Sequence, residues 1–342
     1  MKKLLVIRND KLGDFMLIFP ALCLIKKAMP ELEITALVPA YTAPMAELCP
    51  YIDNIILDVD KNNKNTTRTL INQIKEESFD ACISFFSNNH NAKVTFLSDI
   101  PYRLAPATKI CQYLYNHRLT QHRSKSIKAE FEYNLDLAKY FLKSQNVSIP
   151  IIEPPYLCIN SKIVNKQKQT LTQELNLDIH KKWIFIHSGS GGSATNLNLQ
   201  QYADLSLSLL KNFNCQIVLT AGPGESEQAH HLATLINNPN VVIYDKNKGL
   251  EDFTYSLACS NLFISGSTGP LHISGALNIP TIAFYPSKRS ATSIRWNPIN
   301  QHHLAFSAPK GKYTEMNLEL ISIPNALLQI IPFIQNNFSK QL

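Results

Sequence analysis

The sequence NLFISGSTGPLHISGALNIPTIAFYP, from Asn261 to Pro286, decides the fold of this protein. Residues 262–264 form a short apolar run, residues 270–277 carry apolar side chains at helical spacing, and residues 281–284 form a second apolar run. This order predicts a strand, a turn, a helix and another strand. Because that unit repeats in parallel α/β sheets, the stretch indicates an α/β protein.

The turn within this stretch, Ser265–Gly269, consists of small and hydroxylated residues. Pro270 marks the helix start, because the first helical residue needs no N–H group. The free N–H groups of the first turn then point beyond the end of the strand, where Ser267, Thr268 and Gly269 suit a phosphate group. A tight turn that binds nothing would use the same residue types. His272 lies early in the helix, and the sequence allows it either a packing role or a role in ligand binding.

Length and composition describe a globular protein of two domains. A chain of 342 residues with 45% hydrophobic and 17% charged residues is long enough for two ordinary cores. The net charge of +7 favours anionic partners without choosing among them. The apolar run at 15–25 contains Pro20 and is too short to cross a bilayer.

The cysteines indicate a reducing compartment. All seven are scattered through the chain without a CxxC pair, which is typical of buried free thiols rather than zinc ligands or disulfides. The apolar part of the N-terminus ends at Ile7, too early for a secretory signal. We therefore expect a cytoplasmic protein without a metal site or cofactor.

Two halves of the chain repeat one pattern of strands and helices. Short apolar runs predict strands at 3–7, 34–38, 54–57 and 81–85, and again at 183–186, 216–219, 241–243, 262–264 and 281–284. We predict a first domain over 1–155, a linker over 156–180, a second domain over 181–322, and a helix over 323–342 that packs back on the first domain. Two such parallel sheets bind ligands at the carboxyl ends of their strands, across a shared cleft.

Asp14 is the candidate catalytic residue of the first domain. It follows Gly13, which is the sole glycine before residue 188, at the end of the first predicted strand. An aspartate there could cap the next helix, or it could face the cleft and accept a proton. Arg8 and Lys11 are close enough in sequence to influence its charge. The sequence leaves both roles open.

Glycine-rich loops mark the second domain. Ser188, Gly189, Ser190, Gly191 and Gly192 follow the strand at 183–187 and suit a pyrophosphate, although the loop is not a Walker A motif. Gly222 and Glu225 follow the next strand. Glu225 could bind ribose hydroxyls or cap the helix behind it.

Several of these segments resemble glycosyltransferase family 9, which includes the ADP-heptose:lipopolysaccharide heptosyltransferases. The resemblance rests on residues 8–14 (RNDKLGD), 187–194, 222–225 and 267–272, in order and each at a strand's carboxyl end. It implies a GT-B fold with two Rossmann-like domains facing each other across a cleft. It also implies inverting, metal-independent transfer of a heptose from ADP-heptose to a lipid-anchored inner core.

The resemblance assigns roles to matching positions. It implies that Asp14 is the general base, that Thr268, Gly269 and His272 hold the donor pyrophosphate, and that Glu225 lies near the nucleoside. Two positions depart from the family pattern. Residues 195–198 (TNLN) replace a stretch with a lysine, and Ser267 replaces an aspartate that helps to select the sugar. These departures bear on the donor sugar more than on the reaction.

A basic stretch over 109–128 predicts a contact with an anionic acceptor. We expect acceptor binding by Lys11, Arg118, Arg123, Lys125 and Lys128, and transient contact with the inner face of the cytoplasmic membrane. A solvated loop and helix face would give the same pattern. The spacing Asp58-Val59-Asp60 resembles a metal motif, but its polar surroundings favour a solvated loop.

Two other functions fit the same sequence. One is a different sugar-nucleotide enzyme, such as a transferase with another donor or an epimerase. The other is a two-domain protein that binds a nucleotide or sugar without catalysis. We expect a monomer that binds a nucleotide-sugar donor and a lipopolysaccharide-type acceptor, and that does not bind nucleic acid.

Overall fold

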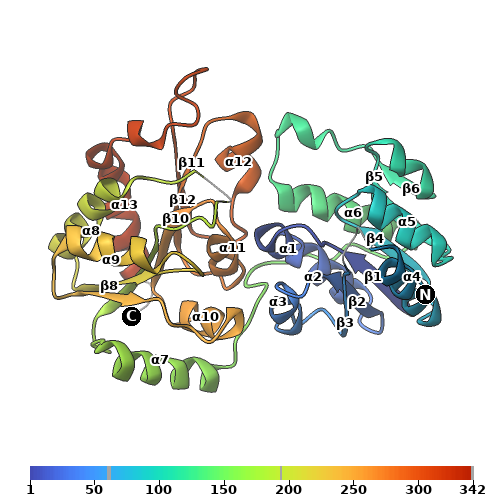
Figure 1. The fold of residues 1–342 in the computed structure, drawn as a ribbon, viewed down its shortest axis with the longest axis horizontal. Coiled ribbons are helices and arrows are strands. Elements are labelled where there is room, and N and C mark those ends of the chain that lie inside the picture. The colour runs from blue at the N-terminus through green and yellow to red at the C-terminus, as the bar shows by residue number, and fades with distance from the viewer. Residues whose placement is uncertain (60–62, 193–194, 340–342) are drawn as a thin grey trace. The chain divides into compact units, whose positions relative to one another are not determined.

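The computed structural model describes residues 1–59, 63–192 and 195–339. The chain divides into two compact units, Met1–Leu157 and Cys158–Leu342. Each unit holds a parallel sheet of six strands with helices packed on it (Figure 1). No helix among these residues is both long and apolar enough to cross a membrane.

The sheet of the first unit has the order β3-β2-β1-β4-β5-β6. Its central strand β1 is buried on both faces, which explains why Leu4–Ile7 is an unbroken apolar run. The strands are β1 (Lys3–Ile7), β2 (Glu33–Val38), β3 (Asn54–Leu57), β4 (Ala81–Ser84), β5 (Tyr102–Pro106) and β6 (His117–Leu119). The helices are α1 (Leu12–Met16), α2 (Phe19–Ala28), α3 (Ala43–Glu47), α4 (Lys64–Glu76), α5 (Asn89–Leu97), η1 (Ile110–Leu114), η2 (Arg123–Lys125) and α6 (Glu130–Ser144).

The second sheet has the order β12-β11-β10-β7-β8-β9. Its strands are β7 (Lys182–His187), β8 (Cys215–Thr220), β9 (Val241–Tyr244), β10 (Leu262–Gly266), β11 (Thr281–Tyr285) and β12 (His303–Ser307). The helices are α7 (Ser161–Leu175), α8 (Leu199–Asn212), α9 (Ser226–Ile236), α10 (Leu250–Leu257), α11 (Gly269–Ala276), η3 (Arg289–Ala291), α12 (Ser293–Trp296), η4 (Leu318–Leu320) and α13 (Ile323–Ser339).

The structure confirms the predicted α/β class and each strand predicted from an apolar run. It adds three strands that the sequence did not reveal, β5, β6 and β12. β6 has only three residues, His117–Leu119, so it carries no period-two pattern. Arg118 therefore lies on a strand and not on the loop or helix face that the sequence also allowed.

Two segments differ from the predicted domain plan. Much of the stretch predicted as linker forms α7, which packs against α10, and Gln167 donates a hydrogen bond to Ser256 of that helix at 2.8 Å. α13 continues through Pro332. Its buried residues Ile330 and Ile334 belong to the core of the second unit, beneath α8 and β12.

Candidate functional site

In each sheet there is one point at which the strand order reverses, so that later strands are added on the other side of the first strand. In the first unit it lies between β1 and β4, and in the second between β7 and β10. Loops leaving two such neighbouring strands diverge to opposite faces of the sheet, and ligands of open α/β proteins bind in the gap that this leaves. The predicted site residues follow these strands.

Arg8 lies at the centre of the site in the first unit. Its side chain is only 3% exposed, and its guanidinium pairs with the carboxylates of Asp10, at 2.8 Å, and Asp14. A third carboxylate, Glu130 of α6, lies 3.4 Å from Nη1. Burial opposes the charge of Arg8, but these acids outweigh burial and raise its pKa. The guanidinium is therefore a fixed cation that orients Asp14.

Asp14 is a buried carboxyl with a raised pKa and is not the cap of α1. The N-cap of α1 is Lys11, and Asp14 lies within the first turn, as does Gly13. Burial raises the pKa of Asp14 to about 6, against the opposing effect of Arg8. A carboxyl with this pKa is ionised at neutral pH and is more basic than an exposed aspartate, which suits a group that accepts a proton.

Asp58 is buried, contrary to the solvated loop expected from the sequence. Its carboxylate accepts a hydrogen bond from Asn9 at 2.6 Å and lies 2.9 Å from Nε2 of His90. Asn91 exchanges amide hydrogen bonds with Asn9, so β1, β3 and α5 are joined at one edge of the sheet. The second aspartate of the expected motif, Asp60, lies outside the described residues.

In the second unit the suspected phosphate loops lie side by side because their strands pair. Ser265 on β10 is in register with His187 on β7. Asn196 holds the loop that follows β7. Its amide donates to the carbonyls of Ser188, at 2.8 Å, and Gly189, at 3.2 Å, and its oxygen accepts from the hydroxyl of Tyr202 at 2.5 Å. These hydrogen bonds hold the backbone at the start of the glycine-rich segment 189–192.

Glu225 binds the glycine-rich loop from the side. It accepts hydrogen bonds from the N–H groups of Gly191, at 2.6 Å, and Gly222, at 2.9 Å. A Cβ atom on Gly189 would lie 2.1 Å from Oε2 of Glu225, so a larger residue at this position would displace the Glu225 carboxylate. Burial disfavours the charge of Glu225, yet the N–H donors and His187 outweigh burial and lower its pKa. Glu225 does not cap α9 with its side chain.

Two buried polar atoms near the end of β10 have no hydrogen-bond partner among the residues that the structure describes. Thr268 is the N-cap of α11, but its hydroxyl makes no hydrogen bond although the residue is only 4% exposed. Nδ1 of His272, one turn further, is also buried without a partner. Burial lowers the pKa of His272 to about 4, so the ring is neutral. A buried hydroxyl without a partner at a helix N-terminus is a candidate donor to an anionic ligand.

The predicted acceptor residues fall into two groups. Arg123 forms an ion pair with buried Glu130 at 2.6 Å, and Lys128 pairs with Asp136. Their charges are therefore used within the unit. Lys11, Arg118 and Lys125 are exposed, and Arg118 lies over the ring of Tyr113 at 5.4 Å. These three cations remain accessible to an acceptor.

Sequence reasoning missed two residues that organise the site. Glu130 reaches Arg8 from 122 positions away, and no local pattern announces such a contact. Asn196 lies in the stretch 195–198, which departs from the family pattern because it lacks a lysine. The sequence did not predict the hydrogen bonds of the Asn196 amide. Of the predicted glycine-rich loop and its flank, residues 193 and 194 lie outside the described part of the chain.

Comparisons with known proteins agree with this architecture. The family model for "Glycosyltransferase family 9 (heptosyltransferase)" matches residues 67–320. A Haemophilus influenzae protein named "Putative glycosyltransferase" is 58% identical over 338 residues, which is 98% of each chain. Lipopolysaccharide heptosyltransferase 1 of Campylobacter coli is 25% identical over 324 residues, covering 87% of this chain and 88% of its own.

The fold matches solved structures across nearly its full length. ADP-heptose lipopolysaccharide heptosyltransferase II of Escherichia coli aligns with a TM-score of 0.80 at 17% identity, covering 98% of this chain and 99% of the other. At that identity the likeness concerns the fold. It shows that the two Rossmann-like units form a GT-B protein, as the sequence predicted.

Proposed function

Because the chain belongs to glycosyltransferase family 9, we propose that this glycosyltransferase moves a heptose from ADP-heptose to the inner core of a lipopolysaccharide, with inversion and without a metal. The observations that carry the proposal are a carboxyl with a pKa of about 6 in the first unit and, in the second unit by itself, a buried hydroxyl and imidazole nitrogen without partners among the described residues. The first can accept a proton, and the second can stabilise a leaving diphosphate.

In this proposal Asp14 is the general base. An acceptor hydroxyl is a weak nucleophile until a carboxylate takes its proton during attack. Arg8 fixes the orientation of Asp14 through Oδ1, and the remaining carboxylate oxygen is free to face the hydroxyl. Asp10 and Glu130 balance the charge of Arg8, which keeps Asp14 basic.

The second unit holds the donor. The hydroxyl of Thr268, which has no partner among the described residues, and the N–H groups at the start of α11 would bind the diphosphate of ADP, since they lie at the positive end of a helix. Ser188, the glycine-rich loop, Gly269 and His272 would flank it, with Ser267 beside the sugar. Glu225 would exchange one of its backbone donors for ribose hydroxyls. These contacts strengthen as negative charge develops on the leaving group.

The acceptor would be anionic and attached to a membrane. Lys11, Arg118 and Lys125 are the accessible cations of the predicted set. They fit phosphate or acidic sugars of an inner core, with the enzyme in the cytoplasm and in transient contact with the inner leaflet.

A matched pair of measurements tests this function. We expect Asp14→Asn to lower turnover of ADP-heptose by about a hundredfold or more, the scale of general base catalysis, while ADP binding by calorimetry stays near that of the unsubstituted protein. Stabilisation by ADP rather than by UDP or GDP in thermal unfolding identifies the nucleotide. Full activity of the Asp14 variant, or selective stabilisation by UDP, would contradict the proposal.

A different donor sugar is the second candidate. Asn196 is neutral and its amide is committed to two loop carbonyls, so it offers no cation to the donor. Ser267 offers a hydroxyl in place of a carboxylate. If another nucleotide-sugar is used, mass spectrometry of donors trapped by Asp14→Asn should find it in place of ADP-heptose.

A further inference from the structure

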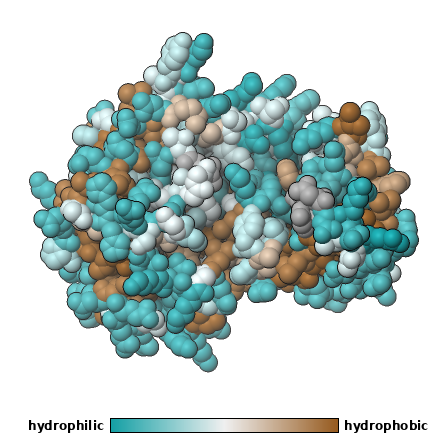
Figure 2. Space-filling view, in the orientation of Figure 1, coloured by the Kyte–Doolittle hydropathy of each residue, from teal (hydrophilic) through white to brown (hydrophobic). Residues whose placement is uncertain are grey.

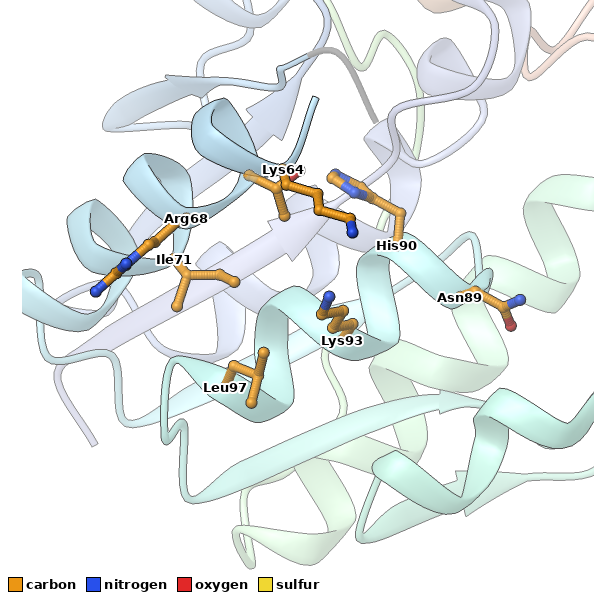
Figure 3. Close-up of a pocket in the computed structure, with 8 residues that line it drawn as sticks. Lys64, Arg68, Ile71, Asn89, His90, Lys93 and Leu97 are labelled. Atoms are coloured by element: carbon orange, nitrogen blue, oxygen red, sulfur yellow. The ribbon is translucent and has the colours of Figure 1, made fainter. Parts of the chain in front are cut away.

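The first unit contains a pocket that the proposed transfer chemistry does not use. It lies between α4 and α5, has a volume of about 500 Å³ and is open to the surface. Three cations line it, Lys64 and Arg68 from α4 and Lys93 from α5, and its wall includes the apolar side chains of Ile71 and Leu97 (Figure 3).

The cations of this pocket have no acidic partner among the residues that the structure describes. Lys64, Arg68 and Lys93 form no ion pair with any residue in the described ranges, whereas Lys75 pairs with Asp99 at the other end of the same two helices. Figure 3 shows Lys64 and Lys93 directed into the space between the helices. Gathering like charges around one space is unfavourable unless an anion shares it.

The polar end of the pocket is built on a buried network. His90 lines the pocket, and its Nε2 lies 2.9 Å from Oδ1 of Asp58. The side chains of both residues are less than a tenth exposed. Asn9 donates to the same aspartate at 2.6 Å, so the ring of His90 is fixed from β1 and β3. The pocket is therefore a preorganised feature of the unit and not a gap between mobile lysines.

Exposed apolar side chains lie on α5 and on the neighbouring η1. Phe96 and Leu97 on α5 are 45% and 43% exposed, and η1, which packs against α5, exposes Ile110 by 87% and Tyr113 by 75%. Figure 2 shows hydrophobic residues on the outer surface of this unit among hydrophilic ones. The chain from 100 to 129 has no acidic residue. Exposed apolar groups next to unpaired cations are typical of surfaces that meet anionic lipid.

We propose that the surface formed by α4, α5 and η1 docks on an anionic phospholipid membrane, with the α4–α5 pocket receiving a lipid phosphate and Ile110 and Tyr113 entering the interface. The role of this docking rests on the proposed function, since the enzyme must reach a lipid-anchored acceptor at a bilayer. The docking itself follows from charge and exposure and needs no donor. Phosphate recognition uses the cations, and the apolar side chains distinguish a lipid from a free anion.

Sedimentation with vesicles tests the docking. We expect the protein to bind vesicles of phosphatidylcholine with phosphatidylglycerol and not those of phosphatidylcholine alone. At about fivefold for each lysine near an anionic surface, Lys64→Gln with Lys93→Gln should weaken binding about 30-fold. The matched control, Lys139→Gln with Lys143→Gln on exposed positions of α6, has the same net charge and should lose less than threefold. Equal losses in both would show that only overall charge matters and would overturn the proposal.

Two further measurements separate binding of a membrane lipid from binding of a free anion. Ile110→Ser with Tyr113→Ser should weaken vesicle binding while leaving the charge unchanged. Monomeric dihexanoylphosphatidylglycerol should raise the unfolding temperature more than inorganic phosphate does, and the pocket variant should abolish this difference. If inorganic phosphate alone gives the full effect, the site binds a free anion and the membrane assignment is wrong. ADP affinity, measured without lipid, reports whether the variants fold and tests the transfer function separately.

Discussion

The side-chain oxygen of Asn196 lies 2.7 Å from the point that a Cβ atom on Gly266 would occupy. This contact seats the last residue of β10 against the amide that holds the glycine-rich loop. This closeness explains the glycine at position 266, where the backbone φ angle is one that any residue can adopt. The two suspected phosphate loops of the second unit are therefore mechanically coupled through one amide.

A double-substitution cycle tests this coupling. Gly266→Ala should displace the Asn196 side chain, break its bonds to Ser188 and Gly189, and lower ADP affinity by about tenfold, since a lost pair of hydrogen bonds is of that order. Asn196→Ala alone should have a similar effect. In the double variant the clash is gone, so the effects should be far from additive when measured by calorimetry. Additive losses would mean that the two residues act independently.

Thr268→Val should change stability and binding in opposite directions. The buried hydroxyl has no partner in the free protein, so replacing it with a methyl should leave the free energy of unfolding unchanged or raise it by about 1 kcal/mol. ADP should bind about tenfold more weakly, because the hydroxyl is a proposed phosphate donor.

The matched control for this variant is Thr254→Val in α10. Thr254 is buried and its hydroxyl donates to the carbonyl of Leu250 at 2.7 Å. Its loss should cost about 1 kcal/mol of stability and leave ADP binding intact. If Thr268→Val destabilised the protein as much as the control does and spared ADP, the hydroxyl would have a structural role only.

The pKa of Asp14 predicts a pH-dependent cost to stability. Burial raises it from 3.8 to about 6 in the folded chain. Between these values the folded state holds more protons than the unfolded state, so this group lowers the free energy of unfolding as pH rises. Relative to the unsubstituted protein, Asp14→Asn should gain on the order of 2 kcal/mol between pH 4 and pH 7. Urea unfolding at four pH values measures this, and parallel curves for the two proteins would contradict it.

The same pKa predicts the pH profile of activity. A general base must be unprotonated, so kcat/KM should fall about tenfold for each pH unit below about 6 and level off above it. The measurement is the initial rate of ADP release at acceptor concentrations well below its KM. A flat profile down to pH 5 would remove Asp14 from the proton transfer.

The predicted acceptor residues should separate on charge reversal. Arg118→Glu with Lys125→Glu should raise the KM for an anionic acceptor while leaving the unfolding temperature nearly unchanged, because both side chains are exposed. Arg123→Glu should cost about 3 kcal/mol, since it places a second acid beside buried Glu130. Thermal unfolding and acceptor titration distinguish the two. Equal destabilisation by both variants would show that the exposed pair also has a structural role.

Local signals in the sequence were sufficient for the repeating units. Short β-branched runs followed by small-residue turns determine where strands end, and they placed Asp14, Ser188, Glu225 and Thr268 at carboxyl ends without any coordinates. These local signals failed where a strand was very short, or where a helix had the same composition as a linker. β6 is too brief to show a period, and the polar, Pro-flanked stretch containing α7 has a linker's composition although its helix packs on α10.

The sequence by itself determined the class of fold, the order of its units and the loops able to hold a phosphate, because these depend on residues close together in the chain. Only the tertiary structure decided that Arg8 links Asp14 to Glu130, that Glu225 and Asn196 secure the glycine-rich loop, and that Arg123 is a structural cation. These pairings span up to 122 positions. Since they arise from strand order and burial, no local pattern could announce them.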